Sequence, residues 1–412
     1  MLETPKANRL HIAIMGRRNA GKSSLINALT NQDLAVVSPK PGTTTDPVYK
    51  AMELLPLGPV MFVDTAGVDD TGDLGRLRVE KTLQVLNRAD VVIIVVSVDQ
   101  PPGAWEEELV QLAKKKGLTT LGVVNKVDLS DLTGAGVQRC LGWFSAREVP
   151  AVGVSALQRQ GIEELKRILI KHLPNHWLDA PIVGDLLSPG DLVILVAPID
   201  ESAPKGRLIL PQVQVLRDIL DHRAMGLTVQ DGELKLALEA VKTRPRMVIT
   251  DSQAFARVAG TTPVDIPLTS FSILFARYKG DLESSLAAIN NLHGLAPGQK
   301  VLIAEGCTHH RQKKDIAQVQ IPKLLDARVG GPLEYSWVSG GEFPRNLSEF
   351  QLVIHCGACM LNRREMLYRV SLAREAGVSM VNFGILLAYM HGVLDRAIQP
   401  LSKRWELRGE IL

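Results

Sequence analysis

A strand followed by a phosphate-binding loop stands near the beginning of the chain: His11-Ile12-Ala13-Ile14-Met15-Gly16-Arg17-Arg18-Asn19-Ala20-Gly21-Lys22-Ser23. The first five residues have the pattern of a buried strand, and residues 24–29 continue as a helix. Residues 16–23 match Gly-x-x-x-x-Gly-Lys-Ser, a loop whose backbone N–H groups face the phosphates of a nucleotide. The helix N-terminus adds partial positive charge. This order predicts an α/β nucleotide-binding domain with a mostly parallel sheet.

The residues of this loop have separate expected roles. Lys22 is expected to reach the β- and γ-phosphates, and Ser23 to ligate Mg²⁺. The nucleotide-binding residues that we expect from the loop are Gly16, Asn19, Ala20, Gly21, Lys22, Ser23 and Ser24.

Three further patterns, each at the end of a strand pattern, indicate which nucleotide binds. Asp64 and Gly67 form Asp-x-x-Gly, in which the carboxylate holds Mg²⁺ through water and the glycine N–H senses the γ-phosphate. Asn125-Lys126-Val127-Asp128 provides a carboxylate that accepts from two donors of guanine, a pair that adenine lacks. The backbone of Ser155-Ala156 can contact the base oxygen. Four patterns in this order predict a GTPase that binds GTP, GDP and Mg²⁺.

The first ~170 residues resemble small GTPases of the Era/TrmE type. Gly42-Thr43-Thr44-Thr45-Asp46 is similar to their Gly-Thr-Thr-Arg-Asp switch, with Thr45 in place of arginine. The resemblance implies that Thr44 binds Mg²⁺, with Thr43 as the alternative, and the expected catalytic set is Lys22, Thr44, Asp64 and Gly67.

Two positions bear on the rate of hydrolysis. Val68 stands where Ras-like enzymes have the glutamine that orients water, and its alternative role is simple packing. Asn19 matches an asparagine that helps hold K⁺ in the TrmE-like group, and its alternative role is that of a loop residue that tolerates a tight turn. The resemblance implies slow hydrolysis that potassium stimulates.

Three of the four cysteines lie in two short pieces near the C-terminus. Two residues separate Cys356 from Cys359, and the pair follows the apolar strand pattern 352–354. Cys307 follows the strand pattern 301–304, with His309 two residues on, whereas His355 directly precedes Cys356. Thiolates with imidazoles nearby suit zinc or an iron–sulfur cluster, and exclude a magnesium or calcium site. We expect the remaining cysteine, Cys140, to be structural.

The order Cys-x-His, 45 residues, His-Cys-x-x-Cys behind such a GTPase resembles the HydF family, the GTPase maturation factors of FeFe-hydrogenase, over the whole chain. The resemblance implies a 4Fe-4S cluster on Cys307, Cys356 and Cys359 with an exchangeable fourth position. It also implies a homodimer that scaffolds and carries the diiron subcluster precursor. The implied partners are two radical-SAM maturases and the apo-hydrogenase.

The roles of the two histidines stay open. His309 and His355 can each supply the fourth ligand, hydrogen-bond to groups around the cluster, or do neither. Glu305 can offer an oxygen or be an ordinary loop carboxylate.

The pattern of strands and helices divides the chain into three α/β domains. We expect a GTPase domain at 1–175, a small middle domain at 176–265 and a cluster-binding domain at 266–412. The middle domain has no catalytic residue pattern, and we predict that it forms the homodimer. In the GTPase domain, the charged residues 106–108 and 114–116 are expected on the solvated face of a helix.

Composition restricts the class of protein. A formal charge of +3 over 412 residues does not suggest a nucleic-acid partner. The longest apolar run, residues 91–96, is too short for a membrane span, and the first ten residues lack the apolar core of a signal peptide. The chain has only four cysteines, and the clustering of three of them favours a reducing compartment. We expect a cytoplasmic protein with no nucleic-acid or membrane partner.

Two other functions fit part of the pattern. One is an Era/TrmE-like RNA or ribosome-assembly GTPase with a structural zinc. The other is a redox-sensing switch in which a cluster controls GTP hydrolysis.

Overall fold

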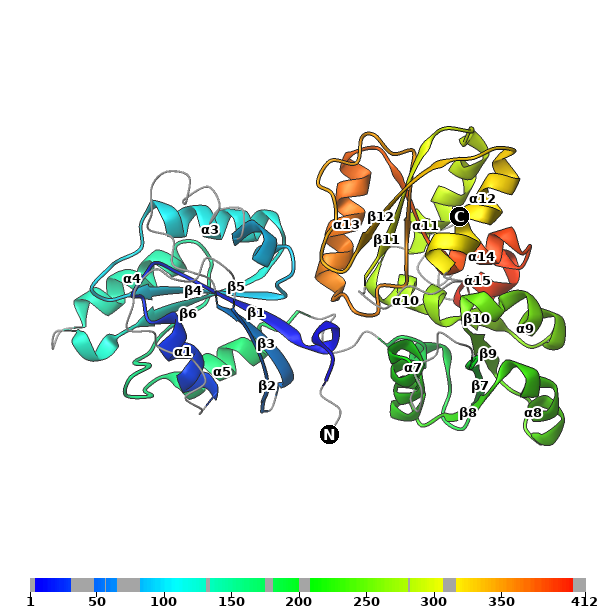
Figure 1. Ribbon diagram of the computed structural model, residues 1–412. Coiled ribbons are helices and arrows are strands. Elements are labelled where there is room, and N and C mark those ends of the chain that lie inside the picture. Colours follow the sequence, from blue (N-terminus) through cyan, green and yellow to red (C-terminus); the bar gives the residue numbers. More distant parts are fainter. Residues whose placement is uncertain are drawn as a thin grey trace. The chain divides into compact units, whose positions relative to one another are not determined.

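The structure is a computed structural model that describes residues 4–30, 48–55, 57–64, 82–130, 134–174, 181–199, 208–280, 282–306 and 316–402. It divides into two compact units, Met1–Ala180 and Pro181–Leu412. In Figure 1 the first unit runs from blue to green-cyan and the second from green to red.

The first unit contains a six-stranded sheet in the order β2-β3-β1-β4-β5-β6. Only β2 is antiparallel to its neighbour, so the expected mostly parallel sheet is confirmed. The central strand β4 is buried at all seven positions, as its unbroken apolar sequence indicates. The strands are β1 (Leu10–Met15), β2 (Val48–Leu54), β3 (Gly58–Asp64), β4 (Val91–Ser97), β5 (Thr119–Asn125) and β6 (Ala151–Gly153).

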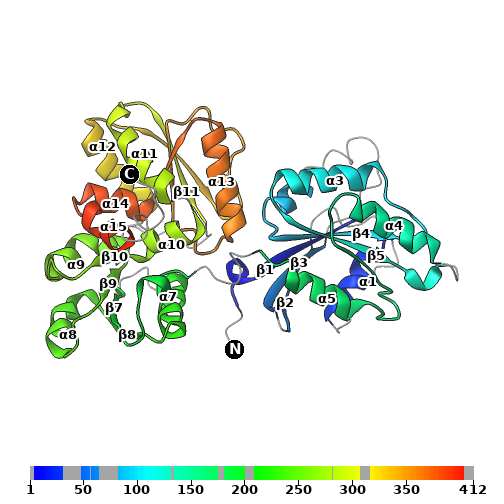
Figure 2. The ribbon, with the colours of Figure 1, turned by 180° about the vertical axis from the view of Figure 1, so that it is seen from behind.

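Helices cover both faces of this sheet, as the two views of Figures 1 and 2 show. Alternate residues of β1 point to opposite faces: Ile12 and Ile14 pack in one core, Ala13 and Met15 in the other. The first core includes residues of α1 and α5, and the second includes residues of α3 and α4. The helices are α1 (Lys22–Thr30), α3 (Ala104–Lys115), α4 (Ala135–Ser145) and α5 (Ile162–Lys171).

The second unit begins with a four-stranded parallel sheet in the order β10-β9-β7-β8. Its last strand, β10, comes after the boundary that we expected at residue 265, and the division of this unit into two domains stays a prediction. The elements are β7 (Leu192–Val196), α7 (Leu210–Asp221), β8 (Met225–Val229), α8 (Leu234–Ala240), β9 (Met247–Thr250), α9 (Phe255–Thr261) and β10 (Leu268–Ser270).

A second four-stranded parallel sheet follows in the order β12-β11-β13-β14. Its strands are β11 (Lys300–Glu305), β12 (Glu334–Ser339), β13 (Leu352–His355) and β14 (Ser379–Asn382). The helices of this part are α10 (Phe271–Lys279), α11 (Leu282–Asn291), α12 (Ile321–Val329), α13 (Arg363–Glu375), α14 (Phe383–Met390) and α15 (Leu394–Ser402).

Short helical turns complete the described secondary structure. The 3-10 turns are η1 (Lys6–Asn8), η2 (Val127–Leu129), η3 (Gly184–Leu186), η4 (Asp231–Glu233), η5 (Ser252–Ala254) and η6 (Leu292–Gly294), and η7 (Ile316–Gln320) is a π-helical turn.

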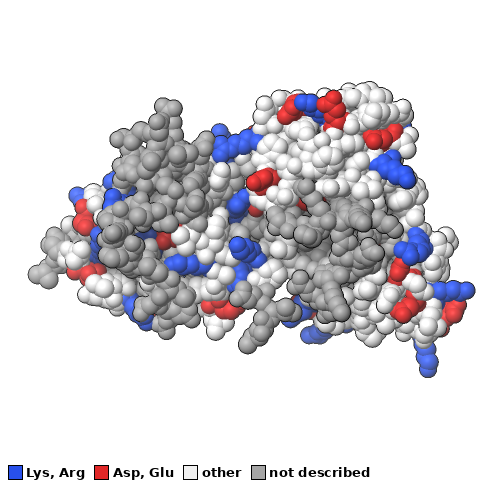
Figure 3. All heavy atoms as spheres, in the orientation of Figure 1, with Lys and Arg blue, Asp and Glu red and all other residues white. Residues whose placement is uncertain are grey.

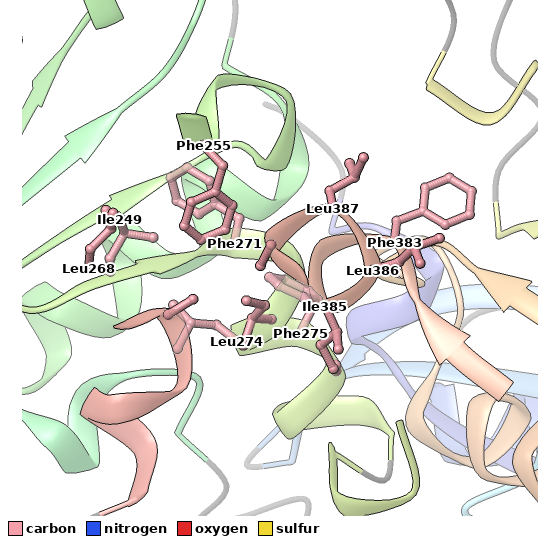
Figure 4. Close-up of a cluster of buried hydrophobic side chains, with 14 of the residues drawn as sticks. Ile249, Phe255, Leu268, Phe271, Leu274, Phe275, Phe383, Ile385, Leu386 and Leu387 are labelled. Carbon is pink, nitrogen blue, oxygen red and sulfur yellow. The ribbon is translucent and has the colours of Figure 1, made fainter. Parts of the chain in front are cut away.

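One hydrophobic core joins the two sheets of the second unit. Figure 4 shows side chains from β9, α9, β10, α10 and α14 that pack together. Helix α14 is apolar on nearly every side, and six of its eight residues are buried, as expected for a helix between two layers. The α/β fold class that we expected is confirmed for both units.

The surface of the described residues is mixed in charge. On the face of the second unit in Figure 3, Lys and Arg side chains lie among Asp and Glu side chains. Within the described ranges, no helix combines the length and the apolar character that crossing a bilayer requires.

Candidate functional site

The phosphate-binding loop connects β1 to α1 at the point where the strand order of the first sheet reverses. Open α/β sheets bind ligands at this point, in the crevice outside the carboxyl ends of the parallel strands. Two glycines permit the loop's path. A Cβ on Gly16 would lie 2.2 Å from the carbonyl oxygen of Val95, and a Cβ on Gly21, whose φ is +87°, would lie 2.1 Å from Asn125 Nδ2.

Lys22 is buried within this loop. Its ammonium group donates to the carbonyl oxygens of Gly16 and Arg17, both at 2.9 Å. These bonds hold the charge inside the loop, where the phosphates of a nucleotide are expected. Asn19 has a left-handed backbone conformation with φ 60°, which is the tight turn that its sequence position allowed.

Ser23 and Asp64 come together although 41 residues separate them. The Ser23 hydroxyl donates to Asp64 Oδ2 at 2.8 Å. Hydroxyl and carboxylate oxygens are ligands that Mg²⁺ accepts, directly or through water. The structure therefore places these two expected Mg²⁺ contacts side by side.

The amide of Asn125 connects three parts of the nucleotide site. Its Nδ2 donates to the carbonyl of Ala20 at 2.9 Å, and its Oδ1 accepts from the N–H of Ala156 at 3.1 Å. Ser155 is fully buried, and its Oγ accepts from the Gln158 N–H at 3.1 Å. Asn125 thus connects Ala156, a residue of the expected base site, to the phosphate loop.

The next two residues of the base-recognition sequence continue from the end of β5. Lys126 is left-handed, with φ 62°, and its ammonium group pairs with Asp99 at 3.2 Å. Asp128 lies in the turn η2 and is half-buried.

An ion pair between the phosphate loop and α3 was not expected. Arg17 Nη2 donates to Glu106 Oε2 at 2.8 Å, and the same oxygen accepts from the N–H of Gly103 at 2.8 Å. Glu106 is only 1% exposed, so the expectation of a solvated helix face is wrong at this residue, although Glu108 is exposed. The sequence has no local sign of this pair, because its members are 89 residues apart.

Several expected site residues lie outside the described residues. They are Thr43, Thr44, Gly67 and Val68 of the nucleotide site, and Cys307 and His309 of the metal site. Among the residues that are described, no group of three or more His, Cys, Asp or Glu is placed to hold a metal ion.

Cys356 and Cys359 lie in the loop after β13, beside the end of β11. The two strands are parallel neighbours, with Ala304 opposite His355. Because β12 and β13 lie on opposite sides of β11, this crevice is the switch point of the second sheet. The N–H of Gly306 donates to Cys356 Sγ at 3.0 Å, and Cys307 is the next residue along the chain. The fold therefore brings the backbone that leads to Cys307 into contact with Cys356.

Cys356 and Cys359 are half-buried. Burial, together with the charges of Cys359 and Glu305, raises the pKa of Cys356 to about 11, although the hydrogen bond from the Gly306 N–H opposes the shift. Burial also raises the pKa of Cys359, although the nearby Lys279 opposes the shift. Metal ligation needs thiolates, so binding must release these protons. N–H groups from Gly306 and Ala358, the latter at 3.4 Å, already point at the Cys356 sulfur, which suits a thiolate ligand of an iron–sulfur cluster or zinc.

His355 is fully buried and both of its ring nitrogens have partners. Nε2 lies 3.0 Å from Arg369 Nη1, and Nδ1 lies 2.8 Å from the carbonyl of Cys356. A guanidinium can only donate, so we assign the proton to Nδ1, which donates to that carbonyl. Burial and the charge of Arg369 lower the pKa of His355 to about 3. The neutral ring therefore orients the backbone of the first loop cysteine.

A network on α13 supports His355. Arg369 is 1% exposed and donates to Glu365 at 2.9 Å and to the carbonyl of Gly340 at 2.6 Å. Its guanidinium also stacks 5.0 Å from the ring centre of Phe343. We did not expect these residues from the sequence, where only the i, i+4 spacing of Glu365 and Arg369 connects them.

A small cavity lies on the inner side of the cysteine loop. Its volume is about 20 Å³, and its lining includes His355, Cys356, Gly357 and Asn382. This space holds about one water and is too small for a metal cluster.

The second unit matches two domain families along most of its length. The hydrogen maturase F dimerization domain matches residues 182–280, and the hydrogen maturase F tetramerization domain matches residues 283–400. Together they cover more than half of the chain. The chain belongs to the hydrogen maturase F family. This maturase also carries a GTPase domain, because the model of the 50S ribosome-binding GTPase family matches residues 11–126.

The curated relatives of this maturase resemble its GTPase part. The tRNA modification GTPase MnmE of Geobacillus kaustophilus is 36% identical over 161 residues, which are 39% of this chain and 33% of that protein. The MnmE of Ralstonia nicotianae is 33% identical over 242 residues, 57% of this chain and 47% of that protein. The matches thus span about a third to a half of the length of these relatives.

Among solved structures, that of Era in complex with MgGDPNP and nucleotides of 16S ribosomal RNA is 23% identical to the maturase. It covers 58% of this chain and 90% of that one, with a TM-score of 0.37.

Proposed function

We propose that this chain is a GTP-hydrolysing scaffold for FeFe-hydrogenase maturation. It binds a 4Fe-4S cluster through Cys307, Cys356 and Cys359, and it assembles or delivers the diiron subcluster precursor to the apo-hydrogenase. The observation that carries this proposal is the contact between Gly306 N–H and Cys356 Sγ in a chain of the hydrogen maturase F family. It supports a site in which the third cysteine joins the other two at one crevice.

The nucleotide half of the proposal assigns a task to each residue around the phosphate loop. Lys22 binds the β- and γ-phosphates, Asp128 selects guanine, and Asn125 holds the two ends of the site together. Mg²⁺ between Ser23 and Asp64 would neutralise charge on the phosphates when bound. The Thr44 hydroxyl and the Gly67 N–H would complete the site; both residues lie outside the part of the chain that the structure describes.

We propose that hydrolysis is slow and stimulated by potassium. The support is the position of Asn19 in the phosphate loop, together with Val68 after Asp-x-x-Gly.

In the cluster-binding part of the proposal, each of the three thiolates would ligate one iron of a 4Fe-4S cubane. A weaker ligand at the fourth iron would leave that position open to a precursor. His355 has both ring nitrogens engaged, which favours its role in orienting the loop. His309 and Glu305 then stay as sources of a fourth ligand.

The proposed assembly is a homodimer in the cytoplasm. The matched domains are named for dimerisation and tetramerisation, which supports self-association. The proposed partners are two radical-SAM maturases and the apo-hydrogenase.

The decisive experiment is anaerobic purification with iron and sulfide analysis, followed by low-temperature EPR of the reduced protein. A 4Fe-4S signal that Cys356→Ser abolishes and Cys140→Ala keeps would support the proposal, because Cys140 lies in the first unit's core. Zinc without iron after reconstitution would instead favour an RNA or ribosome-assembly GTPase. A cluster whose oxidation changes the hydrolysis rate, in a protein that activates no hydrogenase, would favour a redox switch.

A separate experiment tests what the nucleotide does. We propose that its state controls the association of partners. Lys22→Ala should then lose the effect of GTP on the release of the maturases, measured by pull-down. A variant that releases them as readily as the wild type with GTP present would contradict this role.

A further inference from the structure

Lys279, the last residue of α10, lies against the inner side of the cysteine loop. Its Nζ is 2.5 Å from the carbonyl oxygen of Leu361, 3.3 Å from that of Cys359 and 3.4 Å from that of Ala358. The loop after β13 therefore closes around one ammonium group, which holds three of its carbonyls.

The burial of this charge is unusual. The residue is 1% exposed, and charged groups at that depth are normally paired with an opposite charge. Among the residues that the structure describes, no carboxylate forms an ion pair with Lys279. Its described neighbours are carbonyl dipoles, the ring of Phe275 at 5.6 Å, and the thiols of Cys356 and Cys359.

Capping of its own helix does not account for the position of the ammonium group. A lysine near a helix C-terminus usually interacts with the last carbonyls of that helix. The acceptors of Lys279 are instead 79 to 82 residues further along the chain, in the segment that carries the two cysteines. A cation built into that segment complements an anionic group bound on its thiols.

We propose that Lys279 is a positioning residue for the cluster: it holds the loop of Cys356 and Cys359, and its charge raises the reduction potential of the bound cluster. The inference rests on the proposed cluster site. A 4Fe-4S cluster with three thiolate ligands is anionic, and its reduction adds one negative charge. A nearby cation in a medium of low dielectric constant stabilises the reduced form.

The test is an EPR-monitored redox titration of the full chain after anaerobic reconstitution. Lys279→Gln keeps donors for the carbonyls and removes the charge, whereas Lys279→Arg keeps the charge. We expect Lys279→Gln to lower the reduction equilibrium constant about tenfold, a shift of about 59 mV to lower potential for one electron. Lys279→Arg should stay closer to the wild type than Lys279→Gln does.

Lys300→Gln is a matched control in the same unit. Lys300 is a surface residue paired with Glu349, and it begins β11 at the end of the strand opposite the cysteines. The substitution removes the same charge at the far end of β11, roughly 17 Å from the end that faces the cysteines, at about 3.3 Å per residue. Its potential should match that of the wild type.

Each outcome bears on the proposal. A Lys279→Gln protein with wild-type iron content and wild-type potential would overturn it. If Lys279→Gln does not hold the cluster, Lys279→Arg decides: a bound cluster of near wild-type potential supports the role of the charge, and loss of the cluster there as well overturns it. Wild-type protein that binds no iron would contradict the proposed function itself, which separates the two failures.

Discussion

Asn125 occupies the central position of the nucleotide site. Its two hydrogen bonds connect the phosphate loop to the segment after β6. Gly21 allows this arrangement because the amide nitrogen of Asn125 lies where a side chain would begin. The geometry of phosphate and base recognition therefore depends on one glycine.

Gly21→Ala should weaken nucleotide binding. The new Cβ would lie 2.1 Å from Asn125 Nδ2 at a φ of +87°, so both the loop and the amide must move. We expect GDP affinity to fall about tenfold or more, measured by calorimetric titration.

Gly117→Ala is the control for that experiment. Gly117 also has a positive φ, 58°, but open space surrounds its Cβ position. Equal losses of affinity in both variants would mean that backbone strain, and not the contact with Asn125, causes the effect.

His355 should make the stability of the metal-free protein depend on pH. Its folded-state pKa is about 3, below the usual 6.5, so between these values the unfolded state binds more protons. Stability is complete above about pH 6.5 and is lost as the pH falls toward 3. The free energy of unfolding should fall about 1.4 kcal/mol per pH unit more steeply than in His355→Gln, as urea denaturation between about pH 6 and 4 would show.

An exposed imidazole provides the comparison for this pH series. His293 lies on the surface in η6, and His293→Gln should keep the wild-type slope. If the free energy of unfolding falls equally with pH in the wild type and in His355→Gln, the buried ring does not cause the loss of stability in acid.

The site residues that sequence reasoning found are those within local patterns. The phosphate loop, Asn125-Lys126-Val127-Asp128 and Cys356-x-x-Cys359 each place their chemistry within eight residues of chain. Arg17 with Glu106, and Lys279 with the cysteine loop, are pairs separated by about 80 residues or more, and neither spacing is periodic. Such pairs depend on how helices dock on a sheet, which a local pattern does not encode.

At the scale of elements, the sheet of β7 to β10 has two different edges. Helix α15 packs against β10, and Arg396 of that helix donates to the carbonyls of Ala259 and Thr262. At the other edge, β8 pairs with β7 alone among the described strands, and Met225 is 48% exposed there. An unpaired edge with apolar residues is suited to pairing with another chain.

Met225→Lys should weaken self-association. A charge on the free edge of β8 opposes the burial of that edge against a second copy. We expect the dissociation constant to rise about tenfold or more in sedimentation experiments, with unchanged circular dichroism. Val264→Lys, at a residue that is 89% exposed outside the strands, should leave it unchanged. Equal sedimentation of the wild type and Met225→Lys would remove β8 from the interface.

Elements were predictable from the sequence where a short apolar run marks a buried strand. Residues 11–15 predict such a strand, and β1 (Leu10–Met15) is buried at all six positions. The end of the middle sheet was less apparent: β10 has only three residues, Leu268–Ser270, and runs directly into α10. A strand this short has no measurable alternation, and its place in the sheet comes from its pairing with β9.

At the scale of the whole molecule, each unit has its own hydrophobic cores. Those of Met1–Ala180 lie on the two faces of its sheet. In Pro181–Leu412, one core contains residues of both sheets and the other lies on the far face of the second sheet. Cooperative folding is therefore expected for each unit as a whole.

The two units should fold when produced separately. A chain of residues 1–180 should unfold cooperatively on heating and bind GDP, and a chain of residues 181–412 should do so and bind iron on reconstitution. A chain that ends at residue 280 should be unstable, because it would expose Phe271 and Phe275, which the second sheet and α14 cover. Cooperative unfolding of this shorter chain would show that the two sheets are independent.

The partial burial of Cys356 has a consequence for its reactivity toward oxidants. A thiol with a pKa of about 11 is ionised in roughly one molecule in ten thousand at pH 7, and the thiolate is the form that attacks peroxides and disulfides. The protonated thiol should therefore resist oxidation in air, and Cys356 should become reactive only when iron binding displaces its proton. Only protein with a bound cluster should then be sensitive to oxygen.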